Sequence, residues 1–312
     1  MSRSTGHPPA LRLKLPATSA NLGPGFDAAA VALNFYLEIE ASAAAEFSIR
    51  ATGRDAVHCA RLKDNLILDN YRRILTENDR PETPLALQMA NGIPLGMGCG
   101  SSAAGRLAAI ALAVHFGALD WDSQRILEEA TALEGHPDNA AACWLGGFVA
   151  AGCEGPRVRV ARVAPPSDWR VLVVLPKKPL STSKARAMLP ESYSRRDVVA
   201  NLQAVSMLGL AFAQGRGDLL GIAMSDRLHQ PYRAPSCPLL PPLLPLAGKH
   251  GVLGVALSGA GPAVLLVIEK EECLETALLA VRAEIGDAEA ELLTCAFEPV
   301  GASEALFHVK GR

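Results

Sequence analysis

Hydrophobic and polar positions alternate between strand-like and helix-like patterns along the whole chain. Segments of alternating or consecutive apolar residues predict strands at 11–16, 31–39, 47–51, 85–89, 145–149, 171–175, 252–257, 263–268 and 290–297. Apolar residues spaced three or four apart predict helices at 66–75, 107–114, 123–133, 198–214, 219–228 and 271–285. Because strands and helices are interspersed in both halves, the sequence predicts an α+β fold with two domains.

A change in composition separates the two halves. Residues 152–166 are rich in Gly, Pro and Arg, which is typical of a connecting segment. We therefore predict a boundary near 155–165, with an N-terminal domain over 1–160 and a C-terminal domain over 161–312. A chain of 312 residues is long enough for two medium-sized domains.

Composition and charge narrow the class of protein. Hydrophobic residues make up 49%, charged residues 20%, and the net charge is −2, so the chain has no excess of positive charge for nucleic acid. The longest apolar runs, such as Leu107–Val114, are too short to span a bilayer. Residues 1–10 lack the apolar core of a secretory signal. We expect a cytoplasmic protein with neither nucleic-acid nor membrane partners.

The cysteines give no framework for metal or disulfide bonds. There are seven, an odd number, and no two are closer than ten residues, at positions 59, 99, 143, 153, 237, 273 and 295. This spacing excludes C-x-x-C zinc patterns and disfavours paired disulfides, as expected in a reducing compartment.

A glycine-rich loop precedes the buried helix at 107–114. Residues 94–104 read PLGMGCGSSAA, so the backbone can bend with its N–H groups turned inward, and Ser101 and Ser102 are placed to cap the helix. Free N–H groups and the helix dipole at such a junction form a seat for an anion such as phosphate. The Walker A pattern would need a Lys where Ser101 stands, and no clean dinucleotide-binding pattern is present.

Two further segments carry polar side chains in small-residue loops. Residues 16–27 read PATSANLGPGFD, in which Asn21 and Asp27 suit hydrogen bonds to a small polar ligand. Taken alone, that segment is more typical of a structural turn. Residues 134–139 read EGHPDN and place His136 in a loop after a helix, where it could bind substrate or move a proton. The other six histidines have no comparable setting.

Two more features allow a simple and a functional interpretation. Glu128 or Glu129 could face a phosphate-bound Mg²⁺, although a solvated helix face explains either residue taken alone. Residues 254–262 read GVALSGAGP, which is either a plain strand–turn–strand connection or a backbone surface that closes on a ligand.

Together these segments resemble the GHMP kinases, the superfamily named for galactokinase, homoserine, mevalonate and phosphomevalonate kinases. PATSANLGPGFD is similar to its first motif, PLGMGCGSSAA to its second and GVALSGAGPA to its third, in the same order. Within the superfamily, SANLGPGFD, EGHPDNAA and SGAGP are most similar to the homoserine kinases. The resemblance implies an N-terminal domain like the second domain of ribosomal protein S5 and a ferredoxin-like C-terminal domain.

The resemblance also implies an activity and its partners. The implied activity is transfer of the γ-phosphoryl group of ATP, with Mg²⁺, to the side-chain hydroxyl of L-homoserine. The product is O-phospho-L-homoserine, and the reaction is a step of threonine biosynthesis. A homodimer is common in the family. The alternatives are a related kinase acting on another small alcohol, and a non-catalytic relative that binds a nucleotide or metabolite.

Residue roles follow from the same resemblance. It implies that Asn21, Asp27 and His136 hold the amine and hydroxyl of the amino acid, with Asn21 and Asp27 as the catalytic candidates, and that Arg186 and Arg233 grip its carboxylate. Asp27 is the nearest candidate for a general base, and our hypothesis is that it chiefly orients the acceptor. Mg²⁺ is assigned to Glu128, with Glu129 and Glu134 as alternatives. Asn65 is placed near the adenine, and the triphosphate lies along Pro94, Gly96, Gly98, Cys99, Gly100, Ser101 and Ser102.

The chain departs from the family pattern at three positions. Ala30 stands where the first motif usually has Gly, Cys99 where the second has Leu, and Ala256 where a Thr is common before the third. None of these changes removes a charged group, but Ala30 and Ala256 affect the expected shape of the acceptor pocket.

Overall fold

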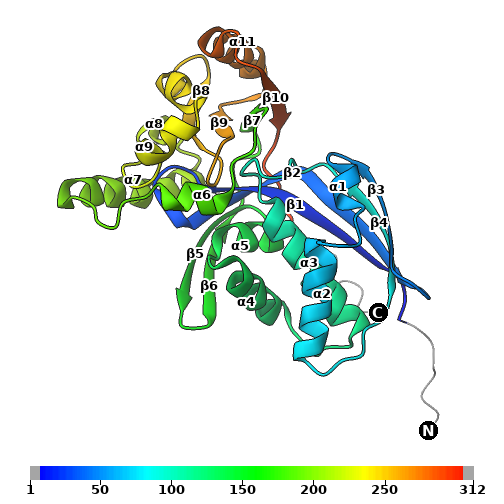
Figure 1. Ribbon diagram of the computed structural model, residues 1–312. Helices are drawn as coiled ribbons and strands as arrows, with labels where there is room; N and C mark the ends of the chain where they lie inside the picture. Colours follow the sequence, from blue (N-terminus) through cyan, green and yellow to red (C-terminus); the bar gives the residue numbers. More distant parts are fainter. Residues whose placement is uncertain (1–7, 305–312) are drawn as a thin grey trace.

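The computed structural model describes residues 8–304, so His7 and His308 lie outside the described residues. Two β-sheets organise the chain (Figure 1). The first has the order β3-β4-β2-β5-β6. Strand β1 lies outside this order and pairs with β2. Only β3 and β4 run parallel; the other pairs are antiparallel. Its strands are β1 (Leu11–Asn21), β2 (Gly25–Ala43), β3 (Ser48–Gly53), β4 (Leu85–Asn91), β5 (Phe148–Glu154) and β6 (Arg157–Val163).

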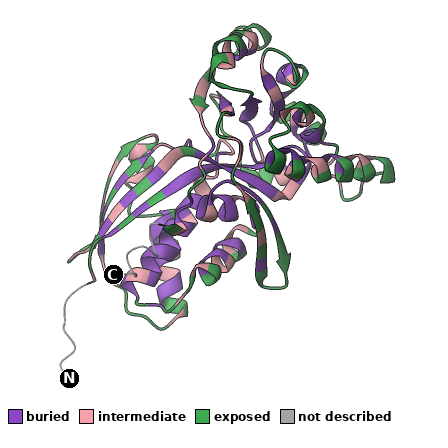
Figure 2. Cartoon of the chain, turned by 180° about the vertical axis from the view of Figure 1, so that it is seen from behind, coloured by how far each residue is buried: buried purple, intermediate pink, exposed green. Residues whose placement is uncertain are grey.

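The helices of the N-terminal part accompany this sheet: α2 to α5 lie below β1 and β2 in Figure 1, and α1 lies beside β3. They are α1 (Ala56–Cys59), α2 (Leu66–Glu77), α3 (Ser101–Phe116), α4 (Ser123–Glu134) and α5 (Asp138–Leu145). Helix α3 is buried on nearly every side, which its Ala-rich sequence permits because small side chains let neighbouring elements approach closely. In Figure 2 this helix is mostly purple, the colour of buried residues.

The second sheet is antiparallel, in the order β10-β7-β9-β8. Its strands are β7 (Arg170–Pro176), β8 (Val252–Leu257), β9 (Val264–Ile268) and β10 (Ala290–Cys295). Around it lie α6 (Thr182–Ala187), α7 (Arg195–Gln214), α8 (Leu220–Ala223), α9 (Gln230–Arg233), α10 (Leu240–Leu243), α11 (Leu274–Ile285) and the 3₁₀ turns η1 (Gly217–Leu219), η2 (Ala234–Ser236), η3 (Leu244–Leu246) and η4 (Glu271–Cys273). This order and the helical connections are those of a ferredoxin-like domain.

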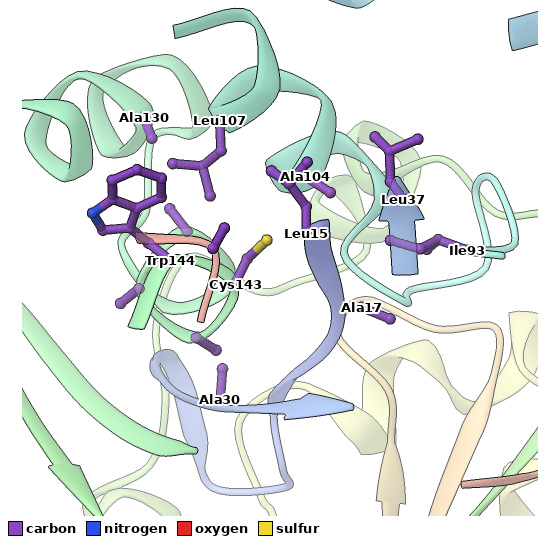
Figure 3. Close-up of a cluster of buried hydrophobic side chains, with 14 of the residues drawn as sticks. Leu15, Ala17, Ala30, Leu37, Ile93, Ala104, Leu107, Ala130, Cys143 and Trp144 are labelled. Carbon is purple, nitrogen blue, oxygen red and sulfur yellow. The ribbon is translucent and has the colours of Figure 1, made fainter. Parts of the chain in front are cut away.

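The core is continuous across the first sheet and its helices. Leu15 of β1, Leu107 of α3, Ala130 of α4 and Trp144 of α5 belong to one buried cluster (Figure 3). Trp144 also donates from Nε1 to the carbonyl and hydroxyl of Ser123, at 3.1 and 2.9 Å, which ties α5 to the start of α4. The second sheet is covered on both faces, because alternate residues of β7 enter two different clusters.

The α+β prediction with two domains is confirmed, but several local predictions were wrong. Residues 157–163 form strand β6 of a hairpin rather than a connection, so the predicted division at residue 160 falls inside a strand of the first sheet. We propose instead a boundary at 164–169, between the two sheets. Helix α5 was not predicted, because its sequence DNAAACWL is buried all round and has no polar face to mark a helical period. Of the predicted helix at 219–228, only 220–223 is α-helical.

Candidate functional site

Two adjoining cavities meet at the beginning of α3. The first, of about 190 Å³, is lined by all three motif segments, the loop at 134–139 and two arginines, and we call it the cleft. The second, of about 200 Å³, is lined mainly by apolar residues of α2, β4 and the segment that follows β4, and we call it the side cavity. Ser101 and Ser102 line both, so the two cavities share the first turn of α3.

The glycine loop turns its carbonyl groups away from the cleft. The carbonyls of residues 96–99 accept hydrogen bonds from the amides of Leu180, Ala263 and Thr18 and, at Gly98, from the hydroxyl of Ser258 at 2.7 Å. Within residues 8–304, no atom accepts a hydrogen bond from the amides of residues 99–102. These N–H groups and the positive end of α3 therefore provide donors for an anion.

Two glycines allow this loop to pack. Gly98 and Gly100 have φ angles of 81° and 72°, in the left-handed region that favours glycine. A Cβ at Gly98 would lie 2.1 Å from the carbonyl oxygen of Ser258, and one at Gly100 would lie 1.8 Å from Oγ1 of Thr18. The predicted capping by serine was wrong: the N-cap is Gly100, without a side-chain cap, and the hydroxyl of Ser102 donates to Glu134 at 2.9 Å instead.

The first motif forms a strained turn between β1 and β2. Asn21, Leu22 and Asp27 all have positive φ angles, which are uncommon for non-glycine residues and cluster at functional sites. The amide of Asn21 stabilises this turn, because Nδ2 donates to the carbonyl of Gly259 at 2.7 Å and Oδ1 accepts from the amide of Asp27 at 3.0 Å. Asn21 thus joins the first motif to the third.

Asp27 and Arg186 form an ion pair across the cleft. Nη1 and Nη2 of Arg186 donate to the two carboxylate oxygens of Asp27 at 2.9 and 2.6 Å. The hydrogen bonds that Arg186 donates to Asp27 raise the pKa of Arg186 above its ordinary value, although partial burial opposes them. Arg233 also lies close to Phe26, whose ring centroid is 5.5 Å from Arg186 and 5.3 Å from Arg233. The two cations therefore lie near the same aromatic ring in the lining of the cleft.

His136 is paired with Asp138, a residue that the sequence analysis did not single out. Nδ1 of His136 lies 2.5 Å from Oδ1 of Asp138, whose side chain is almost fully buried. Burial lowers the pKa of His136, but the hydrogen bond and charge of Asp138, with the charges of Asp27 and Glu134, outweigh it and hold that pKa above its ordinary value. Neither Asp138 nor Glu134 could be recognised from the hydrophobic pattern; the motif EGHPDN that contains both was the available signal.

One group of side chains in the cleft has the geometry of a metal site. Asp27, His136 and Asp138 place one potential ligand atom each within 4.8 Å of the others. One of the three ligand atoms is a histidine nitrogen, whereas Mg²⁺ prefers oxygen ligands. Ser102 and Glu134 offer two oxygen ligands at the start of α3, and Arg106 is hydrogen-bonded to both.

The structure does not bring Glu128 to the cleft. Its carboxylate accepts a hydrogen bond from Gln124 at 2.8 Å, and Gln124 also bonds the carbonyl of Val158 in β6. Glu129 pairs with Arg73 and Arg125. Among the three glutamates considered from the sequence, Glu134 lines the cleft. The reason is rotation: helical positions six apart point in different directions, so Glu128 faces away from the side of α4 where Glu134 lies.

Asn65 lines the side cavity, but its side-chain amide is already hydrogen-bonded to backbone groups. Its Oδ1 caps α2 by accepting from the amides of Ile67 and Leu68, and its Nδ2 donates to the carbonyls of Cys59 and Arg61. Asn65 therefore shapes the cavity wall.

Two other residues assigned to the nucleotide are buried. Pro94 lies at the approach to the glycine loop and does not line either cavity. Cys99 lies within that loop, where burial raises the pKa of its thiol to about 12.

Family models match both domains of the chain. Residues 65–147 match the GHMP kinases N terminal domain, and residues 210–287 match the GHMP kinases C terminal domain. A homoserine kinase of Solibacter usitatus is 44% identical over 259 residues, covering 83% of this chain and 85% of the relative. The chain belongs to the GHMP kinase family.

Other relatives extend the similarity over nearly the full length. A homoserine kinase of Carboxydothermus hydrogenoformans is 36% identical over 298 residues, covering 95% of this chain and 97% of the relative. The crystal structure of homoserine kinase from Cytophaga hutchinsonii has a TM-score of 0.80 at 23% identity over 96% of this chain and 98% of that one. The L. major mevalonate kinase in complex with R-mevalonate has a TM-score of 0.72 at 15% identity, over 95% and 99% of the two chains.

Membership in this family confirms the predicted kinase class and the two-domain fold. GHMP kinases use ATP and act on small molecules, which agrees with the amides of residues 99–102, free within the described part of the chain, beside a cleft of about 190 Å³. No helix within the described residues combines the length and apolar character needed to cross a bilayer.

Proposed function

We propose that this protein transfers the γ-phosphoryl group of ATP to the side-chain hydroxyl of L-homoserine. The observation that carries the proposal is the charge pattern of the cleft. Two guanidinium groups, Arg186 and Arg233, and three carboxylates, Asp27, Glu134 and Asp138, line the same cavity beside the glycine loop. Because Asp138 is bonded to His136 and Glu134 to Arg106, Asp27 is the carboxylate that pairs with a cleft arginine. An amino acid needs this pattern, because its carboxylate requires cations and its ammonium group an anion or carbonyl oxygens.

The two arginines favour an amino acid over an uncharged sugar. A guanidinium binds a carboxylate with two parallel hydrogen bonds, and a galactose or another neutral sugar offers no such group. Arg186 forms an ion pair with Asp27. A zwitterionic acceptor replaces this one ion pair by two, because its carboxylate pairs with Arg186 and its ammonium group pairs with Asp27. Asn21 and His136 complete the wall that holds the amine and hydroxyl.

ATP is accommodated by both cavities. The amides of residues 99–102 and the positive end of α3 bind the phosphates, and the apolar side cavity, with Asn65 in its wall, takes the adenine. Because the two cavities meet at Ser101 and Ser102, the terminal phosphate lies at the edge of the cleft that holds the acceptor. Phosphoryl transfer requires little covalent chemistry from the protein, and positioning of this kind contributes roughly 7–11 kcal/mol.

Mg²⁺ fits beside the first turn of α3. Ser102 and Glu134 provide a hydroxyl and a carboxylate there, which is the donor chemistry that Mg²⁺ prefers. When bound, the ion neutralises charge on the phosphates. Glu134 thus replaces Glu128 as our assignment.

A coupled assay of ADP release tests the proposal. The protein is incubated with ATP and Mg²⁺ and with L-homoserine, (R)-mevalonate, galactose or no acceptor. We expect ADP release that depends on L-homoserine, with O-phospho-L-homoserine as product. Faster release with mevalonate or galactose would identify a kinase for another small alcohol, and ATP binding without turnover on any acceptor would identify a non-catalytic relative. The homodimer implied by the resemblance and the cytoplasmic location expected from the composition stay predictions; gel filtration tests the first and fractionation of cells the second.

A further inference from the structure

A buried histidine connects one of the two cleft arginines to the first motif. His229 precedes α9, and its side chain is fully buried, as is that of Arg233 one turn later. Nη1 of Arg233 lies 3.0 Å from Nδ1 of His229, and Nε2 of His229 lies 2.7 Å from the carbonyl oxygen of Gly23. Arg233 therefore reaches the loop that carries Asn21 and Asp27 through a single imidazole ring.

The chemistry of the two partners determines the form of this imidazole. A guanidinium has only N–H donors and a carbonyl oxygen only accepts, so Nδ1 must accept from Arg233 and Nε2 must carry the proton. A second proton on Nδ1 would remove the acceptor and place two cations in contact. Burial lowers the pKa of His229 and the charge of Arg233 acts in the same direction, against the opposing charges of Asp226 and Asp27. His229 is thus neutral, with its proton on Nε2.

The backbone around His229 is fixed independently of its ring. The carboxylate of Asp226 accepts hydrogen bonds from the amides of residues 228, 229 and 230, at 2.9, 2.9 and 2.6 Å. Asn201 bridges the same two segments, since Nδ2 donates to the carbonyl of Pro24 at 2.8 Å and Oδ1 accepts from the amide of Arg227 at 3.1 Å. The imidazole is therefore not needed to hold the two segments together, which leaves the orientation of Arg233 as its distinct effect.

The bonds of Arg233 leave one edge of its guanidinium for a ligand. Nε donates to the carbonyl of Ala185 at 3.3 Å and Nη1 to His229. Among the described residues, none accepts a hydrogen bond from Nη2, and Arg233 lines the cleft. A long side chain with a free terminal group would otherwise sample several rotamers, so fixing two of its nitrogens sets the direction of the third.

We propose that His229 is a positioning residue for the acceptor: its neutral ring accepts from Arg233, donates to Gly23 and so aims the guanidinium at the carboxylate of the amino acid. This inference rests on the proposed function, because it assigns the orientation of a group that binds the acceptor. His229 does not touch the reacting atoms. Its effect should appear in the binding of the acceptor and not in the binding of ATP.

Two conservative substitutions separate the two hydrogen bonds of the ring. His229→Asn places an amide oxygen near the position of Nδ1 and can keep the acceptor for Arg233 while losing the bond to Gly23. His229→Gln places an amide nitrogen near the position of Nε2 and can keep the bond to Gly23 while losing the acceptor. We expect His229→Gln to raise the KM for L-homoserine roughly ten- to a hundredfold, the range for a lost hydrogen bond to a charged group, with little change in the KM for ATP. His229→Asn should raise the KM for L-homoserine less than His229→Gln, because it keeps the acceptor for Arg233. The matched control His115→Gln, which lies outside both cavities, should change neither KM.

Nuclear magnetic resonance of the wild-type protein with ¹⁵N-labelled histidine supplies a readout that needs no variant. We expect a neutral ring for His229, protonated on Nε2, and a shift of its Nδ1 resonance on addition of L-homoserine. A proton on Nδ1, an unchanged KM for L-homoserine in His229→Gln, or equal rises in the KM for L-homoserine and ATP in both variants would each overturn the inference. Absence of turnover on L-homoserine by the wild type would instead overturn the proposed function, and this inference with it.

Discussion

Arg186 and Asp27 are joined by two hydrogen bonds of 2.9 and 2.6 Å, although they are 159 residues apart in the sequence. Asp27 lies near the start of β2, at the end of the first motif, and Arg186 lies in α6, near the second sheet. Both side chains are about a third exposed, so solvent screens the pair and its contribution to stability is small. The pair is therefore better explained by ligand binding than by folding.

This relationship predicts that binding and stability respond differently to substitution. Arg186→Gln should raise the KM for L-homoserine roughly ten- to a hundredfold while changing the free energy of unfolding by less than about 1 kcal/mol. Steady-state kinetics and urea unfolding measure the two effects.

Asp27→Asn should keep kcat within about tenfold of wild type if Asp27 chiefly orients the acceptor. A fall in kcat of about 10²–10⁴-fold with unchanged binding would show instead that Asp27 is a general base.

A methyl group on the glycine loop should abolish phosphate binding. Gly98→Ala places a Cβ 2.1 Å from the carbonyl oxygen of Ser258 at a positive φ angle, so the loop or the third motif must move. We expect a loss of stability of about 1–3 kcal/mol and a large loss of ATP affinity, measured by calorimetry. Gly152→Ala is the matched control, because nothing lies within 4 Å of the Cβ there and the φ angle is not positive. ATP affinity that survives in Gly98→Ala would remove this loop from the nucleotide site.

The requirement for Mg²⁺ should distinguish two glutamates of one helix. Glu134→Gln should raise the Mg²⁺ concentration needed for half-maximal activity roughly tenfold or more, because it removes a charged oxygen ligand. Glu128→Gln should leave that concentration unchanged, since Glu128 bonds Gln124 and lines neither cavity. The reverse result would restore the assignment made from the sequence.

The raised pKa of His136 makes part of the protein's stability depend on pH. A group whose pKa is higher in the folded state stabilises the fold below its unfolded pKa of about 6.5 and loses that contribution as pH rises through the folded value. The difference in unfolding free energy between wild type and His136→Asn should therefore be larger at about pH 5.5 than at about pH 8.5. Urea unfolding at both values measures it.

Asp138→Asn provides the matched test of the cause. It removes the hydrogen-bonded charge that raises the pKa of His136, so the pH dependence of stability should shrink in this variant. A pH dependence that is unchanged by Asp138→Asn would mean that Asp138 does not set the protonation of His136.

Much of the fold was readable from the sequence, and each error has its own cause. The amphipathic helices α2 and α4 and the strands of the second sheet match their predicted ranges closely, because one face or both faces carry a clear hydrophobic period. Helix α5 is buried on all sides and has no such period, so it was missed. Strand β6 was mistaken for a connection because of the Gly-, Pro- and Arg-rich composition of residues 152–166, although its own sequence RVRVARV alternates arginines with apolar residues.

The sequence by itself determined the ingredients of the site: a glycine loop before a buried helix, two polar loops and two arginines. It could do so because local backbone requirements and recurring motifs are written in consecutive residues. Only the tertiary structure decided that Glu134 and not Glu128 faces the cleft, that Asp27 pairs with Arg186, and that His229 connects Arg233 to Gly23. These relationships depend on side-chain direction and on contacts between segments about 160 to 210 residues apart, which no local pattern encodes.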